Sequence, residues 1–320
     1  MNNSGSPALP LVVIVGPTAS GKSALAMALA KELRGEIVVC DSTQLYRDLD
    51  IGTSKPTAAD RRDIPHHLID VLDPSELATA GGYRDLALAA LAKLRERKRL
   101  PILTVGSGLY MRALLEGLAD LPLRSDEVRA RLRESARKHG AAHLHDVLRK
   151  MDREAAKTIA PTDEQKLIRA IEVCLLTRKP ISEVHRAGRN PLQGWETLKV
   201  GLIPDREELY RRIAERTDAM IAGGWLDEVK GLLAAGIAAD AKVFDFIGYR
   251  EMLAVLRGKL SMEQARATIQ QATRNYAKRQ MTWFRKDTST CWFAGAGDDV
   301  AIQREICAWI SVRLNFAGRA

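Results

Sequence analysis

The sequence is poor in cysteine, and its cysteines are scattered. No two of them have the C-x-x-C spacing of a zinc site, and four in 320 residues are too few for a disulfide framework. They stand at Cys40, Cys174, Cys291 and Cys307. This usage excludes a disulfide-stapled secreted protein and predicts a reduced, cytoplasmic location.

Long hydrophobic runs are also missing. No apolar stretch approaches the roughly 20 residues of a membrane helix. Met1–Pro10 has neither the basic start nor the apolar segment of a secretory signal, and it is expected to be a short disordered tail. We therefore expect no membrane partner.

What the chain has in excess is positive charge. Lysine and arginine number 49 against 40 acidic residues, a net charge of +9. Such a balance favours an acidic partner, of which nucleic acid is the commonest. The alternative is a basic solvated surface without a specific partner.

The most specific motif is a phosphate-binding loop of the pattern G-x-x-x-x-G-K-[ST]. It follows the β-branched run Leu11–Val15 and precedes a helical pattern at Ala24–Ala30. Its residues are Gly16, Pro17, Thr18, Ala19, Ser20, Gly21, Lys22 and Ser23. The alternative, a glycine-rich structural turn, does not explain this flanking strand and helix.

A loop of this kind surrounds a phosphate with backbone N–H groups at a helix N-terminus. Lys22 is expected to reach the terminal phosphates, and the Ser23 hydroxyl is expected to bind Mg²⁺. The motif thus predicts that a di- or triphosphate binds, without saying what is done with it.

The first third of the chain alternates strand and helix patterns. Further strands are predicted at Glu36–Cys40 and Leu100–Val105, with helices over about Tyr83–Arg99 and Leu109–Leu118. This order indicates a parallel sheet with helices on both faces. Ligands bind outside the carboxyl ends of such strands. The loop is therefore expected to share one crevice with Asp41-Ser42 and Gly106-Ser107-Gly108.

Strand signals stop for about seventy residues, where charge-rich helical patterns replace them, and they return at Thr197–Ile203. We predict an α/β protein with a P-loop-type parallel sheet flanked by helices. Its catalytic core is formed by residues 1–122 and 198–320, and residues 123–197 form a small all-helical insertion domain.

Asp41 is the first candidate for chemistry, because it directly follows an apolar strand that ends at the phosphate crevice. It can hold Mg²⁺ or accept a proton from a nucleophile, and the alternative is a helix N-cap. The strand at Leu100–Val105 ends in Gly106, where a motor-type NTPase usually has an aspartate. This weakens an energy-transducing ATPase and leaves small-molecule kinases and transferases that use a diphosphate.

The histidine pair His66-His67 suggests a metal at first sight. Adjacent residues of an extended segment point in opposite directions, and no other ligand cluster lies nearby in the sequence. A structural role is preferred.

Basic and aromatic residues alternate in Thr273–Lys286. On a helix Arg274, Lys278 and Arg285 share one face, whereas Tyr276 and Trp283 lie on another. Cations for phosphates and rings for unstacked bases suit a nucleic-acid strand. An ordinary amphipathic helix with aromatic residues in the core explains this segment equally well.

Six strings together resemble the tRNA dimethylallyltransferases (tRNA isopentenyltransferases), over nearly the whole chain. Besides the phosphate loop they are Asp41–Arg47, Asp50–Pro56, Pro65–Asp70, Ile247–Glu251 and Tyr276–Arg285. The resemblance implies a P-loop NTPase-like fold. It also implies transfer of a dimethylallyl group from dimethylallyl diphosphate to the exocyclic N6 amine of an adenosine. That adenosine lies 3′ to the anticodon in tRNAs that read codons starting with U.

In such an enzyme the loop holds the diphosphate leaving group, with Mg²⁺ as cofactor. The resemblance implies Asp41 as the base, Thr18 near the bridging oxygen, and Arg250 as a further cation on the diphosphate. The adenosine would enter by base flipping.

The partners implied are dimethylallyl diphosphate and a tRNA anticodon stem-loop, bound by a monomeric enzyme. The expected tRNA-binding residues are Asp41, Ser42, Thr43, Gln44, Ser107, Arg129, Gln165, Lys166, Leu167, Ile168, Arg169, Arg274, Lys278, Arg279, Gln280, Trp283 and Arg285. One departure is Gly106-Ser107-Gly108, where the family usually has Gly-Gly-Thr. A second is Ala80-Gly81-Gly82-Tyr83, where the family is Ala-rich and carries Phe. Neither change touches the proposed catalytic residues.

Two other functions fit part of the sequence. A P-loop small-molecule or nucleoside kinase explains the loop, Asp41 and the sheet, but leaves the basic aromatic helix unexplained. A non-catalytic RNA-binding protein explains the charge, but leaves a complete phosphate loop without a use.

Overall fold

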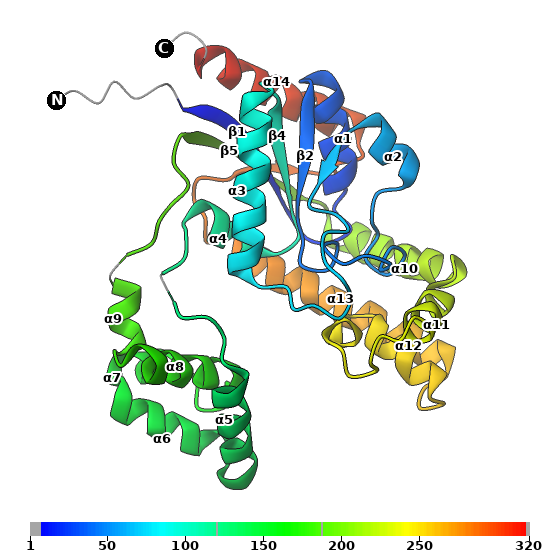
Figure 1. Cartoon of the computed structure of the whole chain (residues 1–320). Helices are drawn as coiled ribbons and strands as arrows, with labels where there is room; N and C mark the ends of the chain where they lie inside the picture. The colour runs from blue at the N-terminus through cyan, green and yellow to red at the C-terminus, as the bar shows by residue number, and fades with distance from the viewer. Residues whose placement is uncertain (1–7, 120, 187, 318–320) are drawn as a thin grey trace, which may run out of the picture. The chain divides into compact units, whose positions relative to one another are not determined.

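The computed structural model describes residues 8–119, 121–186 and 188–317, and these form two compact units. The first contains the residues up to Leu114 and from Gln193 onward, and the second contains Leu115–Leu192 (Figure 1). The second unit begins and ends earlier than the insertion expected at 123–197. Its end differs because residues 195–197 pair with β1 and so belong to the sheet.

The first unit is built on one six-stranded, all-parallel sheet with the order β3-β2-β4-β1-β5-β6. This confirms the predicted fold class. The strands are β1 (Leu9–Val15), β2 (Gly35–Cys40), β3 (His66–His67), β4 (Leu100–Val105), β5 (Trp195–Ile203) and β6 (Cys291–Ala294).

The expected tail at Met1–Pro10 was wrong for its last residues. Leu9 and Pro10 are part of β1, where they pair with Trp195 and Glu196 of β5, and Met1–Pro7 lie outside the described residues. Strands β3 and β6 were missed, because two and four residues give too short a pattern to recognise.

Helices cover both faces of the sheet, which is why the strands read as continuous apolar runs. Helix α1 (Lys22–Glu32) buries Leu25 and Leu29 against the sheet, and α14 (Val300–Ala317) packs beside it. Helices α3 (Ala80–Glu96) and α4 (Gly108–Leu115) lie over the other face (Figure 1).

Helix α2 (Ala58–Asp63) lies beside α1, where Asp63 pairs with Lys31 (Figure 1). The remaining helices of this unit lie beyond the carboxyl ends of the strands (Figure 1). They are α10 (Arg206–Ala222), α11 (Trp225–Ala234), the 3-10 turn η1 (Lys242–Asp245), α12 (Tyr249–Leu256) and α13 (Met262–Phe284). A second apolar cluster joins them around Trp225, Tyr249 and Tyr46.

The second unit is all-helical. It contains α5 (Asp126–His139), α6 (Ala141–Met151), α7 (Arg153–Thr158), α8 (Glu164–Thr177) and α9 (Ile181–Arg186). The carboxylate of Glu172, fully buried, accepts hydrogen bonds from both Arg129 and Arg169. Despite the burial, these bonds hold the pKa of Glu172 down at about 2, so the buried group stays ionised and paired.

Gly248 allows the closest packing in the second cluster. A Cβ at this position would lie 1.8 Å from Cη2 of Trp225, and its φ of +93° is left-handed. Gly258 is also left-handed, at +66°, but a Cβ there would meet nothing within 4 Å.

We therefore predict that Gly248→Ala lowers the free energy of unfolding by about 3 kcal/mol or more, since it adds a clash to the backbone strain. Gly258→Ala, the matched control, should cost only about 1 kcal/mol of strain. Urea titrations followed by tryptophan fluorescence measure both, and equal losses would show that Trp225 moves aside freely.

Candidate active site

A cavity of about 630 Å³ lies at the carboxyl end of the sheet. The phosphate loop forms its floor, the ends of β2 and β4 form one side, and α10 and α13 close it. The phosphate loop, Asp41 and Gly106 therefore meet at one cavity, as predicted from the strand ends.

The phosphate loop connects β1 to α1 and turns sharply at Gly16, Ala19 and Gly21, where φ is positive. Gly21 has no room for a side chain, because a Cβ would lie 2.6 Å from the backbone nitrogen of Gly297. The Lys22 ammonium donates to the carbonyls of Gly16 and Pro17, at 2.9 and 2.7 Å. The loop is thus held in shape by its own lysine.

Asp41 follows β2 and lines the cavity. Its Oδ1 accepts hydrogen bonds from the backbone N–H and the hydroxyl of Thr43, at 2.9 and 2.8 Å. No helix begins there, so the N-cap alternative is wrong, and the carboxylate instead stabilises a turn. Its Oδ2 lies against Gly106, where a Cβ would come within 2.0 Å of it.

Helix α13 contacts both the loop and the end of β4. Gln280 accepts from the Thr18 N–H at 2.7 Å and donates to the Gly106 carbonyl at 2.8 Å. The Tyr276 hydroxyl donates to the same carbonyl at 2.9 Å. Gln280 was expected to bind tRNA, but in the structure both of its amide atoms are used within the protein.

The aromatic side chains of α13 are also turned toward the protein. Tyr276 lines the cavity, and Trp283 packs on Gly108, where a Cβ would lie 2.5 Å from its ring. Both side chains are half-buried, so each ring contacts the protein and keeps part of its surface exposed.

The sequence analysis missed two arginines of α10. Arg216 donates from Nη1 to the Thr18 hydroxyl at 3.2 Å, and Arg212 donates from Nε to the Ala19 carbonyl at 2.9 Å. Both line the cavity. In the sequence, only their four-residue spacing on an amphipathic helix indicates that the two side chains share a face. Such spacing is common on exposed charged helices, so it does not identify a binding site.

Lys22 and Arg216 are two half-buried cations of the cavity lining. Burial and the charge of Arg216 lower the pKa of Lys22 to about 7, against the opposing effect of Asp41. Burial likewise lowers the pKa of Arg216. Two positive groups held in a poorly solvated site favour a bound anion.

Arg250, expected as a further cation on the diphosphate, lies outside the cavity lining. Its side chain is 61% exposed, pairs with Glu251 at 2.8 Å and does not line the cavity. Arg250 is the second residue of α12, and its side chain is exposed, whereas the preceding Tyr249 is buried in the core. The cavity lining instead contains Arg216.

The expected tRNA-binding residues of α8 differ in their exposure to solvent. Leu167 and Ile168 are in the core of the second unit and cannot present their side chains to a partner there, because they lie on the buried face of α8. On the same helix Gln165 and Lys166 are exposed, whereas Arg169 is bound to Glu172.

In the first unit, the Ser107 hydroxyl accepts from the Ser42 N–H at 3.0 Å, which ties the ends of β4 and β2 together. Exposed on α13 are Lys278 and Arg279, followed by Arg285, and Arg274 is half-buried beside Tyr210. The basic face of α13 therefore remains available to an acidic partner.

The oxygen groups near the loop fit Mg²⁺. Ser23 is exposed to the cavity, which Asp41 also lines, and hard oxygen ligands completed by phosphate and water are what Mg²⁺ prefers. Among the described residues no cluster of three or more His, Cys, Asp or Glu could hold a metal on its own. The histidine pair binds the Ile64 carbonyl and Glu36 instead, which fits the structural role.

Comparisons with known proteins agree with the site. The family model "IPP transferase" matches residues 44–287, and "Isopentenyl transferase" matches residues 9–70. A tRNA dimethylallyltransferase of Koribacter versatilis is 50% identical over 295 residues, covering 92% of this chain and 96% of that protein. One from Solibacter usitatus is 49% identical, with coverages of 91% and 94%.

Solved structures are similar over most of the chain. The tRNA isopentenylpyrophosphate transferase of Bacillus halodurans has a TM-score of 0.71 and 38% identity, covering 97% of this chain and 98% of its own. A eukaryotic dimethylallyltransferase acting on tRNA has a TM-score of 0.77 and 26% identity, covering 92% and 75%. None of the described helices has the length and apolar character needed to cross a bilayer.

The pKa of Lys22 predicts how anion binding depends on pH. The free ammonium loses its proton near pH 7, and a bound diphosphate raises that pKa. Above about pH 7 the complex therefore holds one more proton than the free protein, so affinity should fall by up to about tenfold per pH unit.

Calorimetric titration with an alkyl diphosphate at about pH 8, in two buffers of different ionisation enthalpy, measures this proton uptake directly. The ligand's own last ionisation, near about pH 6, is complete there. Lys22→Met should abolish the uptake, whereas Lys31→Met, an exposed lysine of the same helix, should keep it. Binding without proton uptake in the unsubstituted protein would contradict the prediction.

Proposed function

Because the chain belongs to the IPP transferase family, whose relatives are tRNA dimethylallyltransferases, we propose a role for each part of its cavity. The chain is a tRNA-modifying prenyltransferase. The observation that carries the residue assignment is that the phosphate loop, Asp41 and Arg216 line one cavity. We assign the loop side of it to the donor, dimethylallyl diphosphate, and the Asp41 side to the acceptor amine.

The donor's diphosphate lies on the loop amides, within reach of Lys22 and Arg216. Arg216 already bonds the Thr18 hydroxyl, so both groups are positioned before a ligand arrives. The Ser23 hydroxyl, together with phosphate oxygens, would hold a Mg²⁺ ion, which would further neutralise negative charge when bound. These groups stabilise the charge that develops on the leaving diphosphate.

The acceptor is the N6 amine of the adenosine 3′ to the anticodon, flipped out of its stack. The amine nitrogen forms a bond to C1 of the dimethylallyl group while the C1–O bond breaks, and the electron pair leaves with diphosphate. The proton lost by nitrogen goes to Asp41, whose Oδ1 is held by Thr43 and whose Oδ2 remains for this transfer.

The anticodon stem-loop is bound by polar and positively charged side chains. In the first unit these are Lys278, Arg279 and Arg285 with the half-buried Arg274, and in the second unit Gln165 and Lys166 of α8 are the exposed candidates. We propose that the enzyme works as a monomer in the cytoplasm, where tRNA is found.

The proposed reaction is tested by incubating the protein with an unmodified anticodon stem-loop, Mg²⁺ and either dimethylallyl diphosphate or ATP. Mass analysis of the nucleosides should show a prenylated adenosine with the first donor only. Phosphoryl transfer from ATP without prenylation would instead support a kinase.

Asp41→Asn keeps an acceptor oxygen for the Thr43 turn but removes the base. We expect kcat to fall by about 10²- to 10⁴-fold, the usual contribution of a general base, while the affinity for the stem-loop stays within about threefold. Single-turnover rates and filter binding measure the two quantities. Retention of activity within a few-fold would exclude Asp41 as the base.

Arg216→Gln and Arg250→Gln distinguish the two candidate cations. Loss of Arg216 should lower kcat/KM for the donor by about 10²- to 10³-fold, the range for a group that stabilises developing charge. Arg250→Gln should leave donor kinetics within about threefold, because its side chain is exposed and is not part of the cavity lining. The reverse order of effects would restore Arg250 to the site.

A further inference from the structure

One wall of the cavity is a loop that the proposed chemistry does not use. The segment Leu49–Pro56, here called the wall loop, contributes Thr53 and Ser54 to the cavity lining. It follows Gln44, which lines the same cavity. Ser54 has a left-handed φ of +51°, a conformation that a non-glycine residue keeps only where its surroundings hold it.

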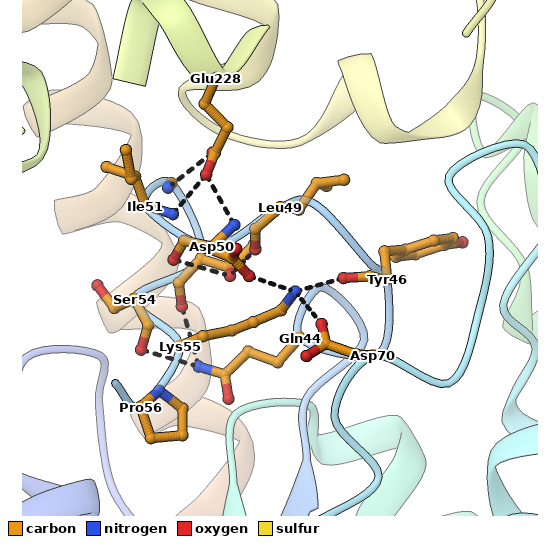
Figure 2. A network of polar contacts seen from close by, with 12 residues as sticks. Gln44, Tyr46, Leu49, Asp50, Ile51, Ser54, Lys55, Pro56, Asp70 and Glu228 are labelled. Atoms are coloured by element: carbon orange, nitrogen blue, oxygen red, sulfur yellow. Dashed lines mark hydrogen bonds and ion pairs between the residues drawn. The ribbon is translucent and has the colours of Figure 1, made fainter. Parts of the chain in front are cut away.

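The base of the wall loop is held by a buried lysine. The side chain of Lys55 is 1% exposed, and its ammonium bonds Asp70 at 2.5 Å, Asp50 at 2.9 Å and the Tyr46 carbonyl (Figure 2). A buried ammonium with three acceptors has all its protons used. Lys55 therefore binds no ligand and acts as the internal anchor of this loop.

The tip of the wall loop is held from a distant helix. The carboxylate of Glu228, on α11, accepts from the backbone N–H groups of Asp50, Ile51 and Gly52 at 2.8, 2.6 and 3.2 Å (Figure 2). It also accepts from the Tyr249 hydroxyl at 2.6 Å. Four donors to one carboxylate fix the tip against the helical layer.

The wall loop in turn fixes the amide of Gln44. Its Nε2 donates to the carbonyls of Thr53 and Ser54, at 2.9 and 3.3 Å (Figure 2). Carbonyl oxygens only accept, so the amide nitrogen must face the loop. The carbonyl oxygen of Gln44 is then the amide atom left for a ligand, and it is an obligate acceptor.

We propose that Lys55 and Glu228 are positioning residues for the acceptor amine, acting through the wall loop and Gln44. This inference rests on the proposed function. The exocyclic amine carries two N–H groups, of which one gives its proton to Asp41. The Gln44 oxygen receives the other, which orients the nitrogen lone pair toward the donor carbon. A base with a carbonyl at that position would place oxygen against oxygen and be rejected.

The test is a double-mutant cycle on the rate of prenyl transfer to the anticodon stem-loop. The single variants are Lys55→Met, Glu228→Gln and Gln44→Ala, and the combinations place each of the first two in the Gln44→Ala background. Lys259→Met, an exposed lysine of the same unit, is the matched control. Thermal unfolding verifies that each variant is folded, and the nearly isosteric Glu228→Gln carries the test where Lys55→Met does not fold.

Each single variant should lower kcat/KM for the stem-loop by about tenfold, the effect of losing one oriented hydrogen bond, with the donor KM unchanged. In the Gln44→Ala background the further loss should be less than about twofold, because the path through Gln44 is already cut. The control should match the unsubstituted protein.

Independent, multiplicative effects would overturn the inference, as would equal losses for donor and acceptor, which indicate general disruption of the fold. Absence of any prenyl transfer by the unsubstituted protein would instead reject the proposed function. The two failures are therefore distinguishable.

Discussion

The arrangement of the cavity depends on one backbone carbonyl, that of Gly106. It accepts hydrogen bonds from Tyr276 and Gln280, and Gln280 also accepts from the Thr18 N–H. Through this one point α13 connects the end of β4 to the phosphate loop. Gly106 is itself required to lack a side chain, because Oδ2 of Asp41 occupies that space. The loop, the proposed base and the basic helix are thus held in one geometry.

That geometry concentrates positive charge where water is scarce. Lys22 and Arg216 lie near each other with burial lowering the pKa of each, and Asp41 is the anion that opposes this effect on both. Such an arrangement costs folding free energy, since buried cations prefer an anionic partner. Under the proposed function, a bound diphosphate offsets this cost, and the same charges then face the leaving group. The site thus lowers the folding stability of the protein but holds its charged groups in position before a ligand binds.

Local motifs could be predicted from the sequence, whereas contacts between distant segments could not. The phosphate loop and Asp41 are defined within a few residues of strand ends, and they lie where the periodicity predicts. Arg216 enters the site only because α10 returns to the loop after the second unit, which no local pattern encodes. For Arg250 the reverse holds, because the local pattern was recognised but did not show that the side chain lies outside the cavity lining. Its string, Ile247–Glu251, has a clear pattern, but it forms the start of α12, where Glu251 bonds the Gly248 N–H.

The segments Asp50–Pro56 and Ile247–Glu251 are far apart in the sequence but are held together in the structure. Glu228 joins them, because its carboxylate binds the backbone of the first and the Tyr249 hydroxyl of the second. Trp225, three residues earlier on α11, fills the space left by Gly52 and Gly248, where a Cβ would lie 2.1 and 1.8 Å from its ring. Neither string then needs a reactive group to matter for the reaction. Their residues hold the wall loop, which lines the cavity together with the phosphate loop. In the proposed reaction, the distance between donor carbon and acceptor amine depends on how firmly that wall is held.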